Sequence, residues 1–214
     1  MRKIIFLLAF TMFLGFQSKG QHRPGKKYLN VGYSSQNLKM DYAGITTIDL
    51  DSDIGATLNF GRTFYLLKNP VANRLYFGID VTFLDLNYTK ATFIDTEDDD
   101  EEYLTHKAEV NMQVGPSVHL NIVDKLTVSG HVRYAPGYSM MYADDEFSSG
   151  YVGFVVAGLA LNYGPFGLGF ETRSATANHN FSVDAEEIEE GNTSTSVDRP
   201  IKLYGNRIYL AFRF

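Results

Sequence analysis

The chain of 214 residues contains no cysteine and no tryptophan. The absence of cysteine excludes disulfides, thiolate catalysis, cysteine metal sites and a lipid anchor on an N-terminal cysteine. Cationic side chains are also few: the net charge is −6 at pH 7 and falls to about −9 without Arg2, Lys3 and Lys19. This negative balance disfavours nucleic acid as a partner, because its phosphates attract basic surfaces.

Long apolar runs are absent after residue 20. The chain starts with a basic pair, Arg2 and Lys3, followed by an apolar run of 13 residues from Ile4 to Phe16 and by Ser18-Lys19-Gly20. This order predicts a signal peptide over residues 1–20, cleaved before Gln21. A membrane anchor is disfavoured because a spanning helix needs about 20 apolar residues.

The rest of the chain is rich in aromatic residues and in alternating patterns. It has 16 Phe, 14 Tyr and 19 Gly, a composition that favours β-structure. From Lys107 to Ile122 polar and apolar residues alternate without a break, and residues 126–142 repeat the pattern. A period of two residues predicts long strands with one polar and one apolar face.

The same pattern predicts eight strands, each long enough to cross a bilayer at a tilt, for which about 9–11 residues suffice. They cover residues 28–42, 54–65, 75–88, 107–122, 126–142, 150–163, 166–178 and 201–214. Short connections (66–73, 123–125, 164–165) alternate with long ones (43–52, 89–105, 141–149, 179–200). This alternation is typical of a transmembrane barrel, so we expect an all-β, eight-stranded antiparallel transmembrane β-barrel.

Three local features predict bulges within these strands or a tight turn between them. Pro116 and Pro136 each remove a hydrogen-bond donor, so we expect bulges there. Phe83-Leu84 changes which positions of its strand are apolar, which also indicates a bulge. Gly164-Pro165 predicts a two-residue type II′ hairpin that pairs Tyr163 with Phe166.

The last strand places four apolar residues on one face, Ile208, Leu210, Phe212 and Phe214. In this ending, and in strand number and loop asymmetry, the chain resembles the OmpA/OmpX-like family of small outer-membrane barrels. The resemblance implies an N-terminal periplasmic extension (21–27), a barrel domain (28–214) and a place in the outer membrane of a Gram-negative bacterium. It also implies three partners: outer-membrane lipids, lipopolysaccharide, and the barrel-assembly machinery that recognises the last strand.

The polar faces predict a charged interior. An eight-stranded barrel has room for side chains only, and buried ions of opposite sign should pair. We expect Asp80 and Glu171 to accept from Arg133, Arg173 and Arg207 at mid-height. A salt-bridged plug is the favoured interpretation, and a gated ion path is the alternative.

Carboxylates gather in the four long connections, which hold 19 of the 25 Asp and Glu residues when Asp53 is included. Such runs are usually solvated. Weak binding of divalent cations, bridging to lipopolysaccharide phosphates, is a sharper alternative. The stretch from Asp49 to Gly55 departs from a calcium loop, and no metal or cofactor site is predicted.

The leading functional hypothesis is a non-enzymatic outer-membrane protein in envelope structure or surface interaction. Three alternatives stay open: a narrow porin-like conduit, a lipid A-modifying enzyme, and a secreted lipocalin-like barrel. His179 and Ser182, with Glu171 on the same strand, are the residues that a lipid A deacylase would use, but nothing in the sequence orients them.

Overall fold

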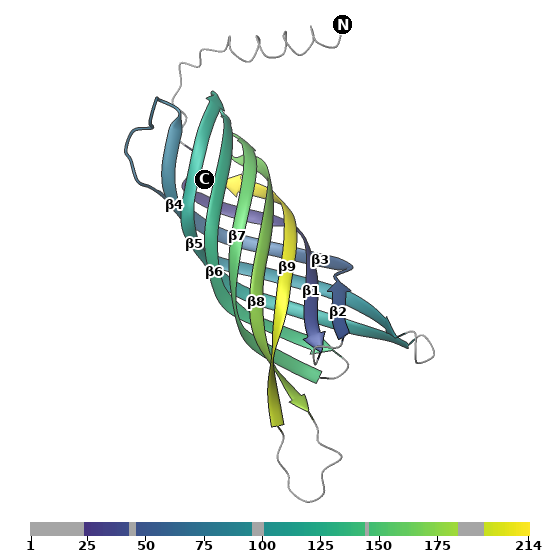
Figure 1. Cartoon of the computed structure of the whole chain (residues 1–214). Helices are drawn as coiled ribbons and strands as arrows, with labels where there is room; N and C mark the ends of the chain where they lie inside the picture. The colour runs from purple at the N-terminus through teal and green to yellow at the C-terminus, as the bar shows by residue number, and fades with distance from the viewer. Residues whose placement is uncertain (1–23, 43–45, 96–100, 144–145, 184–194) are drawn as a thin grey trace, which may run out of the picture.

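The computed structural model describes residues 24–42, 46–95, 101–143, 146–183 and 195–214. Figure 1 shows these residues as one sheet of long, tilted strands. The strands are β1 (Lys27–Tyr42), β2 (Thr46–Asp51), β3 (Ile54–Tyr65), β4 (Leu75–Asp95), β5 (Glu101–Val123), β6 (Leu126–Ala143), β7 (Glu146–Tyr163), β8 (Phe166–Val183) and β9 (Thr195–Arg213). Among the described residues no helix is long and apolar enough to cross a membrane. The predicted signal peptide lies outside the described residues.

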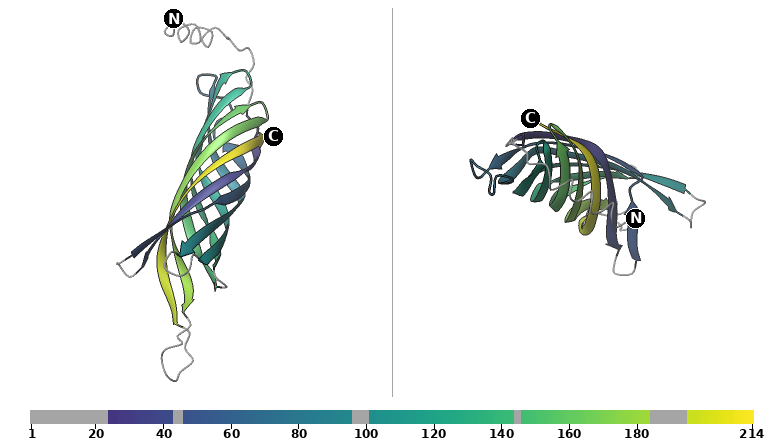
Figure 2. Two further views of the ribbon diagram at one scale, coloured as in Figure 1. Left: turned by 90° about the vertical axis from the view of Figure 1, so that its right-hand side faces the viewer. Right: turned by 90° about the horizontal axis from the view of Figure 1, so that it is seen from above.

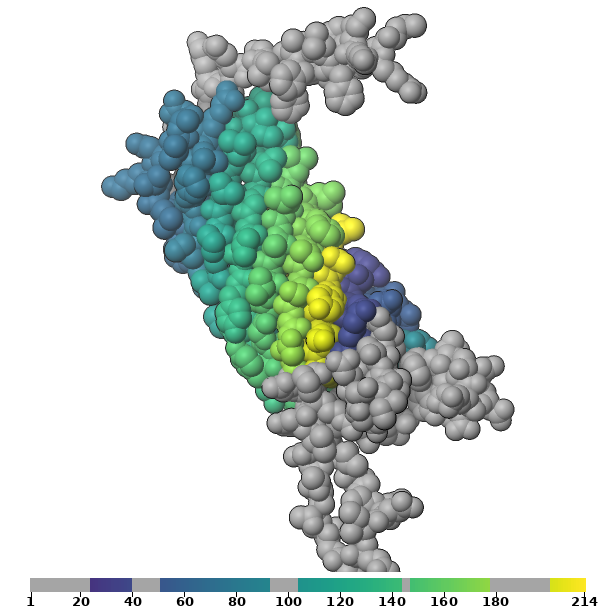
Figure 3. Space-filling view, in the orientation of Figure 1, coloured from purple at the N-terminus to yellow at the C-terminus, as the bar shows by residue number. Residues whose placement is uncertain are grey.

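The sheet closes on itself, because β1 pairs with β9 along its length. Figure 3 shows this seam, with β1 (purple) directly beside β9 (yellow). Both β2 and β3 pair with β1, and Ser52 between them donates its N–H to the Gln36 carbonyl at 2.8 Å. They therefore form one barrel strand with a bulge at residues 52–53. The predicted eight-stranded antiparallel barrel is confirmed.

The pairing register makes the barrel narrow. Following paired residues from Asn30 through every strand and back to β1 arrives at Met40, ten residues further along. A stagger of this kind tilts strands by roughly 35–45° and leaves an eight-stranded barrel with space for side chains only. The tilt is visible in both views of Figure 2.

The side-chain faces are the predicted ones in the two strands with the clearest alternation. In β5, Lys107, Glu109 and the other odd-numbered residues up to 113 are buried, whereas the even-numbered apolar residues from 110 to 120 are exposed. In β6, His131 and Arg133 point inwards and Val132 and Tyr134 outwards. The apolar faces of the strands therefore form the outer wall.

The bulge at Phe83-Leu84 is confirmed: both side chains are exposed, and the register shifts between Thr82 and Asp85. The bulges expected at Pro116 and Pro136 are wrong. Asn111 pairs with Gly137 and Ser117 with His131, in one unbroken register. Each proline removes a single donor, and the flanking pairs hold the register.

The hairpin at Gly164-Pro165 is confirmed, since Tyr163 pairs with Phe166 and Leu161 with Leu168. Gly164 has φ +59°, the left-handed value that a first central turn residue needs. Phe214 lies at the same end of the barrel, because its neighbour Arg213 donates its N–H to the Pro165 carbonyl at 2.7 Å. The Phe214 backbone in turn exchanges hydrogen bonds with Lys27, the first residue of β1. The first strand thus starts one residue before the expected boundary of the barrel domain.

The four long connections are much shorter than predicted. Four of the strands run well past their expected ends: β4 to Asp95, β5 back to Glu101, β8 to Val183 and β9 back to Thr195. Residues 89–94 are rich in Thr, Phe and Ile, which favour strands even in a polar stretch. The β8–β9 hairpin therefore projects from the barrel as a ribbon at the lower end of Figure 1.

Replacing Gly32 by alanine should weaken barrel closure. A Cβ there would lie 2.1 Å from the Ile208 carbonyl oxygen and 2.6 Å from Tyr209 Cα, across the β1–β9 seam. We expect Gly32→Ala to lower the free energy of unfolding by about 1–3 kcal/mol, measured by urea titration in detergent micelles. Gly130→Ala is the control, since the nearest atom to its Cβ would be the end of the Leu159 side chain at 3.3 Å. Equal stability of the two variants would contradict this account of the seam.

Candidate functional site

The charged residues of the interior come from several strands of the barrel wall. Asp80 lies on β4, Arg133 on β6, Glu171 on β8 and Arg207 on β9, each at an inward position. All four are at most 2% exposed. Unpaired ions at such burial cost several kcal/mol each, so the partners of each group decide whether the arrangement is stable.

Arg133 connects the two predicted acceptors. Its Nη2 lies 2.6 Å from Asp80 Oδ2, and its Nη1 lies 3.4 Å from Glu171 Oε1. Asp80 also accepts hydrogen bonds from the hydroxyls of Thr63 at 2.6 Å and Ser117 at 2.9 Å. The carboxylate therefore has three donors from three strands, which compensates its removal from water.

Arg207 contacts one predicted and one unpredicted acceptor. Its Nη1 lies 3.7 Å from Glu171 Oε2 but only 2.9 Å from Asp85 Oδ1. Gln113 links this pair to Arg133: its amide nitrogen donates to Asp85 at 2.7 Å and its oxygen accepts from Arg133 at 3.0 Å. The two arginines thus belong to one network.

Arg173 differs from the prediction, because it pairs with Glu109 and with neither Asp80 nor Glu171. Glu109 also pairs with Lys107 and accepts from the Gln36 amide at 2.9 Å. Arg173 lies one inward position beyond Glu171 on β8, in the direction of the long β8–β9 hairpin. The guanidinium stacks on Phe154, with Cζ 3.4 Å from the ring centroid.

The paired ions of the interior are balanced in number. Four carboxylates (Asp80, Asp85, Glu109, Glu171) face four cations (Lys107, Arg133, Arg173, Arg207). We call these eight residues the interior network. Three of them, Asp85, Glu109 and Lys107, are absent from the predicted set. Lys107 and Glu109 lie on the polar face that the alternation marks, whereas Asp85 turns inwards only because of the Phe83-Leu84 bulge.

A glycine makes room for a histidine beside this network. His131 Nε2 lies 2.9 Å from Glu171 Oε1. A Cβ on Gly158 would be 2.6 Å from both His131 Nε2 and Glu171 Cγ. Ser117, which pairs with His131 across β5 and β6, donates its hydroxyl to Asp80 instead, so the hydroxyl is not oriented as a nucleophile towards the imidazole.

The residues considered for a lipid A deacylase are far apart along their strand. His179 and Ser182 lie in the outer extension of β8, and Glu171 lies eight residues before His179. At about 3.3 Å per residue, eight residues span roughly 26 Å. Glu171 is therefore engaged with Arg133 and His131 deep in the barrel and does not assist His179.

An apolar cluster shares the interior with the charges, a feature that the sequence analysis does not predict. Its members are Leu38, Ala135, Met141, Val152, Phe154, Val156, Ala177, Ile201 and Leu203. They lie on the parts of β1 and β6–β9 that lead towards the long hairpins. The expectation of a wholly polar interior is thus incomplete. Residues 152–156 are apolar at odd-numbered and even-numbered positions alike, and this pattern in the sequence indicates the apolar cluster.

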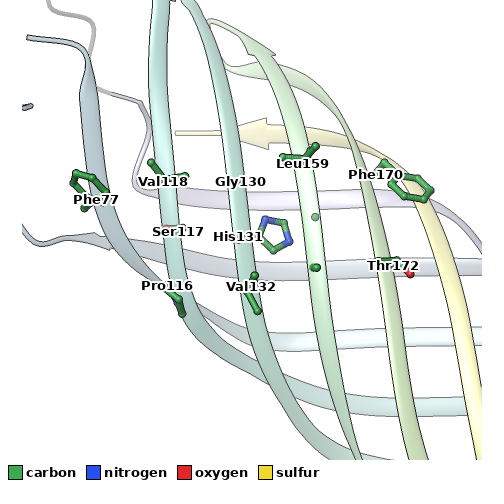
Figure 4. A pocket seen from close by; sticks show the side chains of 12 residues that line it. Phe77, Pro116, Ser117, Val118, Gly130, His131, Val132, Leu159, Phe170 and Thr172 are labelled. Carbon is green, nitrogen blue, oxygen red and sulfur yellow. The ribbon is translucent and has the colours of Figure 1, made fainter. Parts of the chain in front are cut away.

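The outer wall has an apolar groove of about 620 Å³ across β4–β8. Figure 4 shows its lining, which includes Phe77, Val132 and Leu159. The groove exists because Gly130 and Ala157 present almost no side chain between these larger residues. It opens on the outside of the barrel and adds no passage through the lumen.

The acidic connections lie mainly outside the described residues, including 96–100, 144–145 and 184–194. Within the described ranges no group of three or more His, Asp or Glu side chains is arranged to hold a metal ion. The divalent-cation prediction thus falls on segments about which the structure says nothing.

The four residues of the predicted C-terminal signal are exposed on the outer wall. They are Ile208, Leu210, Phe212 and Phe214. Phe212 packs at a tilt against both Phe166 and Phe214, with ring centroids 5.4 Å apart in each pair. The final strand therefore ends in an aromatic cluster at the short-turn end.

No family model matches the chain, and no curated protein matches it. Among solved structures it is similar to Ail, the attachment invasion locus protein of Yersinia pestis (15% identity, 90% of this chain and 100% of that chain, TM-score 0.49). It is also similar to the outer membrane protease OmpT from Escherichia coli (8% identity, 94% and 98%, TM-score 0.49). A third likeness is to Neisserial surface protein A (9% identity, 90% and 100%, TM-score 0.45).

Neutralising Asp80 should destabilise the barrel strongly. Asp80→Asn leaves Arg133 buried with a partial set of acceptors, so we expect a loss of about 3–5 kcal/mol in the free energy of unfolding, measured by urea titration. Asp124→Asn is the matched control, because Asp124 is exposed in the turn between β5 and β6. A loss below 1 kcal/mol for Asp80→Asn would show that the interior network does not stabilise the fold.

Proposed function

We propose that this chain is an integral outer-membrane protein of a Gram-negative bacterium, a small OmpA/OmpX-like barrel that serves envelope structure or surface interaction. The observation that carries this proposal is the inversion of burial. Among the described residues, buried polar or charged side chains outnumber buried hydrophobic ones by 30 to 15. Large apolar side chains are exposed on every barrel strand, which is stable only if something apolar covers them.

Hydrocarbon is the cover that fits a belt around the whole circumference. Val31, Phe60, Leu84, Val114 and Val132 are exposed on five successive barrel strands. A protein partner would cover one side, whereas lipid surrounds a barrel evenly. Exposed tyrosines border the belt towards the long hairpins, as expected at a membrane interface. They are Tyr88, Tyr138, Tyr142, Tyr151 and Tyr204.

The filled interior supports a structural or surface role over transport. The interior network and the apolar cluster occupy the lumen from mid-height towards the long hairpins, with most members under 3% exposed. Conduction would need these groups to separate. The strands, up to 23 residues long in β5, exceed what a bilayer requires and carry the hairpins outwards. Those acidic hairpins are the parts that would meet lipopolysaccharide, divalent cations or another surface.

A charge placed on the outer wall tests the membrane assignment. Val114 is 47% exposed and lies mid-strand, whereas Leu120 lies near the short turn. In liposomes Val114→Arg should cost about 2–4 kcal/mol of folding free energy and Leu120→Arg about 0–1, because the cost rises towards the bilayer midplane. On a soluble barrel both exposed substitutions would be near neutral. Neutral Val114→Arg, together with a wild-type monomer that stays dissolved without detergent, would refute the proposal.

The plug interpretation makes a separate prediction for the wild-type protein. In planar lipid bilayers it should show no steady conductance steps, because neutral pairs of ions and apolar side chains fill the lumen. Arg173→Ala combined with Phe154→Ala removes the stacked pair where the interior network meets the apolar cluster, and it should produce measurable steps. Stable steps from the wild type would instead support the conduit alternative.

A further inference from the structure

Two cations interrupt the apolar outer wall near the short-turn end. Lys27 on β1 and Arg62 on β3 are cross-strand partners, and both face outwards. Their same-face neighbours are apolar: Leu29 follows on β1, and Phe60 and Phe64 flank Arg62 on β3. Like charges directly opposite each other on an antiparallel pair are unfavourable. A lipid-facing wall makes this pairing more costly, so it calls for a counter-ion.

The barrel itself supplies little negative charge at this place. Lys26 adds a third exposed cation beside the pair. Within the described ranges no Asp or Glu side chain forms an ion pair with any of the three. The cluster of three cations therefore keeps a positive balance.

The contacts of the two cations leave their charged ends available. Lys27 Nζ lies 5.9 Å from the centre of the Phe214 ring, and Arg62 Cζ lies 5.1 Å from that of Phe64. Backbone groups hold the segment in place: Lys27 N–H donates to the Phe214 oxygen at 2.8 Å, and Thr63 N–H donates to the Lys26 carbonyl at 2.6 Å. The cations are thus fixed by the strand pairing and not by carboxylate partners.

These residues form a pocket with a specific shape. A hollow of about 410 Å³ is lined by Pro24, Gly25, Lys26, Lys27, Arg62 and Phe214. It lies at the end of the barrel that carries the short turns, where the apolar belt stops. Its cationic side borders the outward apolar row of Leu29 and Phe60. A ligand with an anionic head and an apolar tail matches both parts.

We propose that Lys27 and Arg62 bind the phosphate of an anionic phospholipid in the membrane leaflet next to the short turns. The guanidinium offers paired N–H donors to phosphate oxygens, and the ammonium adds a point charge. The acyl chains lie along Leu29, Phe60 and Phe64. This inference rests on the proposed membrane location, and it adds a lipid-specific site to it.

Native mass spectrometry of the detergent-solubilised protein tests the site. The probes are phosphatidylglycerol, phosphatidylcholine and inorganic phosphate, each titrated separately. Lys27→Gln combined with Arg62→Gln should weaken phosphatidylglycerol binding roughly 30-fold, since each cation near an anionic lipid surface contributes about fivefold. Arg74→Gln combined with Lys125→Gln is the matched control, because it removes one Arg and one Lys from exposed turn positions at the same end. The control should retain wild-type binding.

Several results would overturn the inference. Equal weakening of phosphatidylglycerol binding by both double variants would mean general charge attraction. Equal affinity of the wild type for the two lipids would mean that Lys27 and Arg62 do not discriminate between lipid headgroups. Binding of inorganic phosphate as tight as that of the lipid would mean a plain anion site. The comparison of lipids uses wild-type protein, so it holds even if the Lys27/Arg62 variant folds poorly. Wild-type protein that fails to insert into liposomes overturns the proposed function as well, whereas insertion without lipid selectivity overturns this inference alone.

Discussion

Closure of the sheet at a stagger of ten residues is the constraint on which the rest of the structure depends. It makes the lumen too narrow for bulk water, so the inward-facing side chains, every second residue of a strand, must find their partners within the lumen. The polar faces of the strands are thereby turned into a buried core. Glycine sites such as Gly32 and Gly158 follow from the same constraint, because backbone or a neighbouring side chain occupies the space that a Cβ would need.

Charge balance is how the interior satisfies that constraint. The interior network joins four carboxylates with four cations across β4, β5, β6, β8 and β9. Removing one member leaves an opposite charge buried without its partner. The loss of one partner of a buried ion pair costs more than the replacement of both partners by apolar residues. The network therefore ties strands distant in sequence to one another, as a hydrophobic core does in a soluble protein.

The apolar cluster shows that the interior is not uniform along the barrel axis. Arg173, stacked on Phe154, marks the place where the network meets the cluster. Beyond it the wall carries residues such as Val152 and Leu203, both fully buried. The strands continue past the apolar belt, so side chains there pack as an ordinary core beneath the hairpins. The outer surface also changes along the barrel axis: the apolar belt ends in tyrosines towards the long hairpins and in Lys27 and Arg62 towards the short turns.

The sequence alone determined the strand number, the faces of β5 and β6, the Gly164-Pro165 hairpin and the bulge at Phe83-Leu84. Each depends on a two-residue period or a turn preference, which neighbouring residues decide. Tertiary structure alone decided which ions meet: Arg173 with Glu109, and Arg207 with Asp85. It also decided that β2 and β3 form one barrel strand and that Ile201 joins the apolar cluster. These contacts join residues up to 122 positions apart, and their heights agree only through the stagger of the closed barrel, which no local pattern encodes.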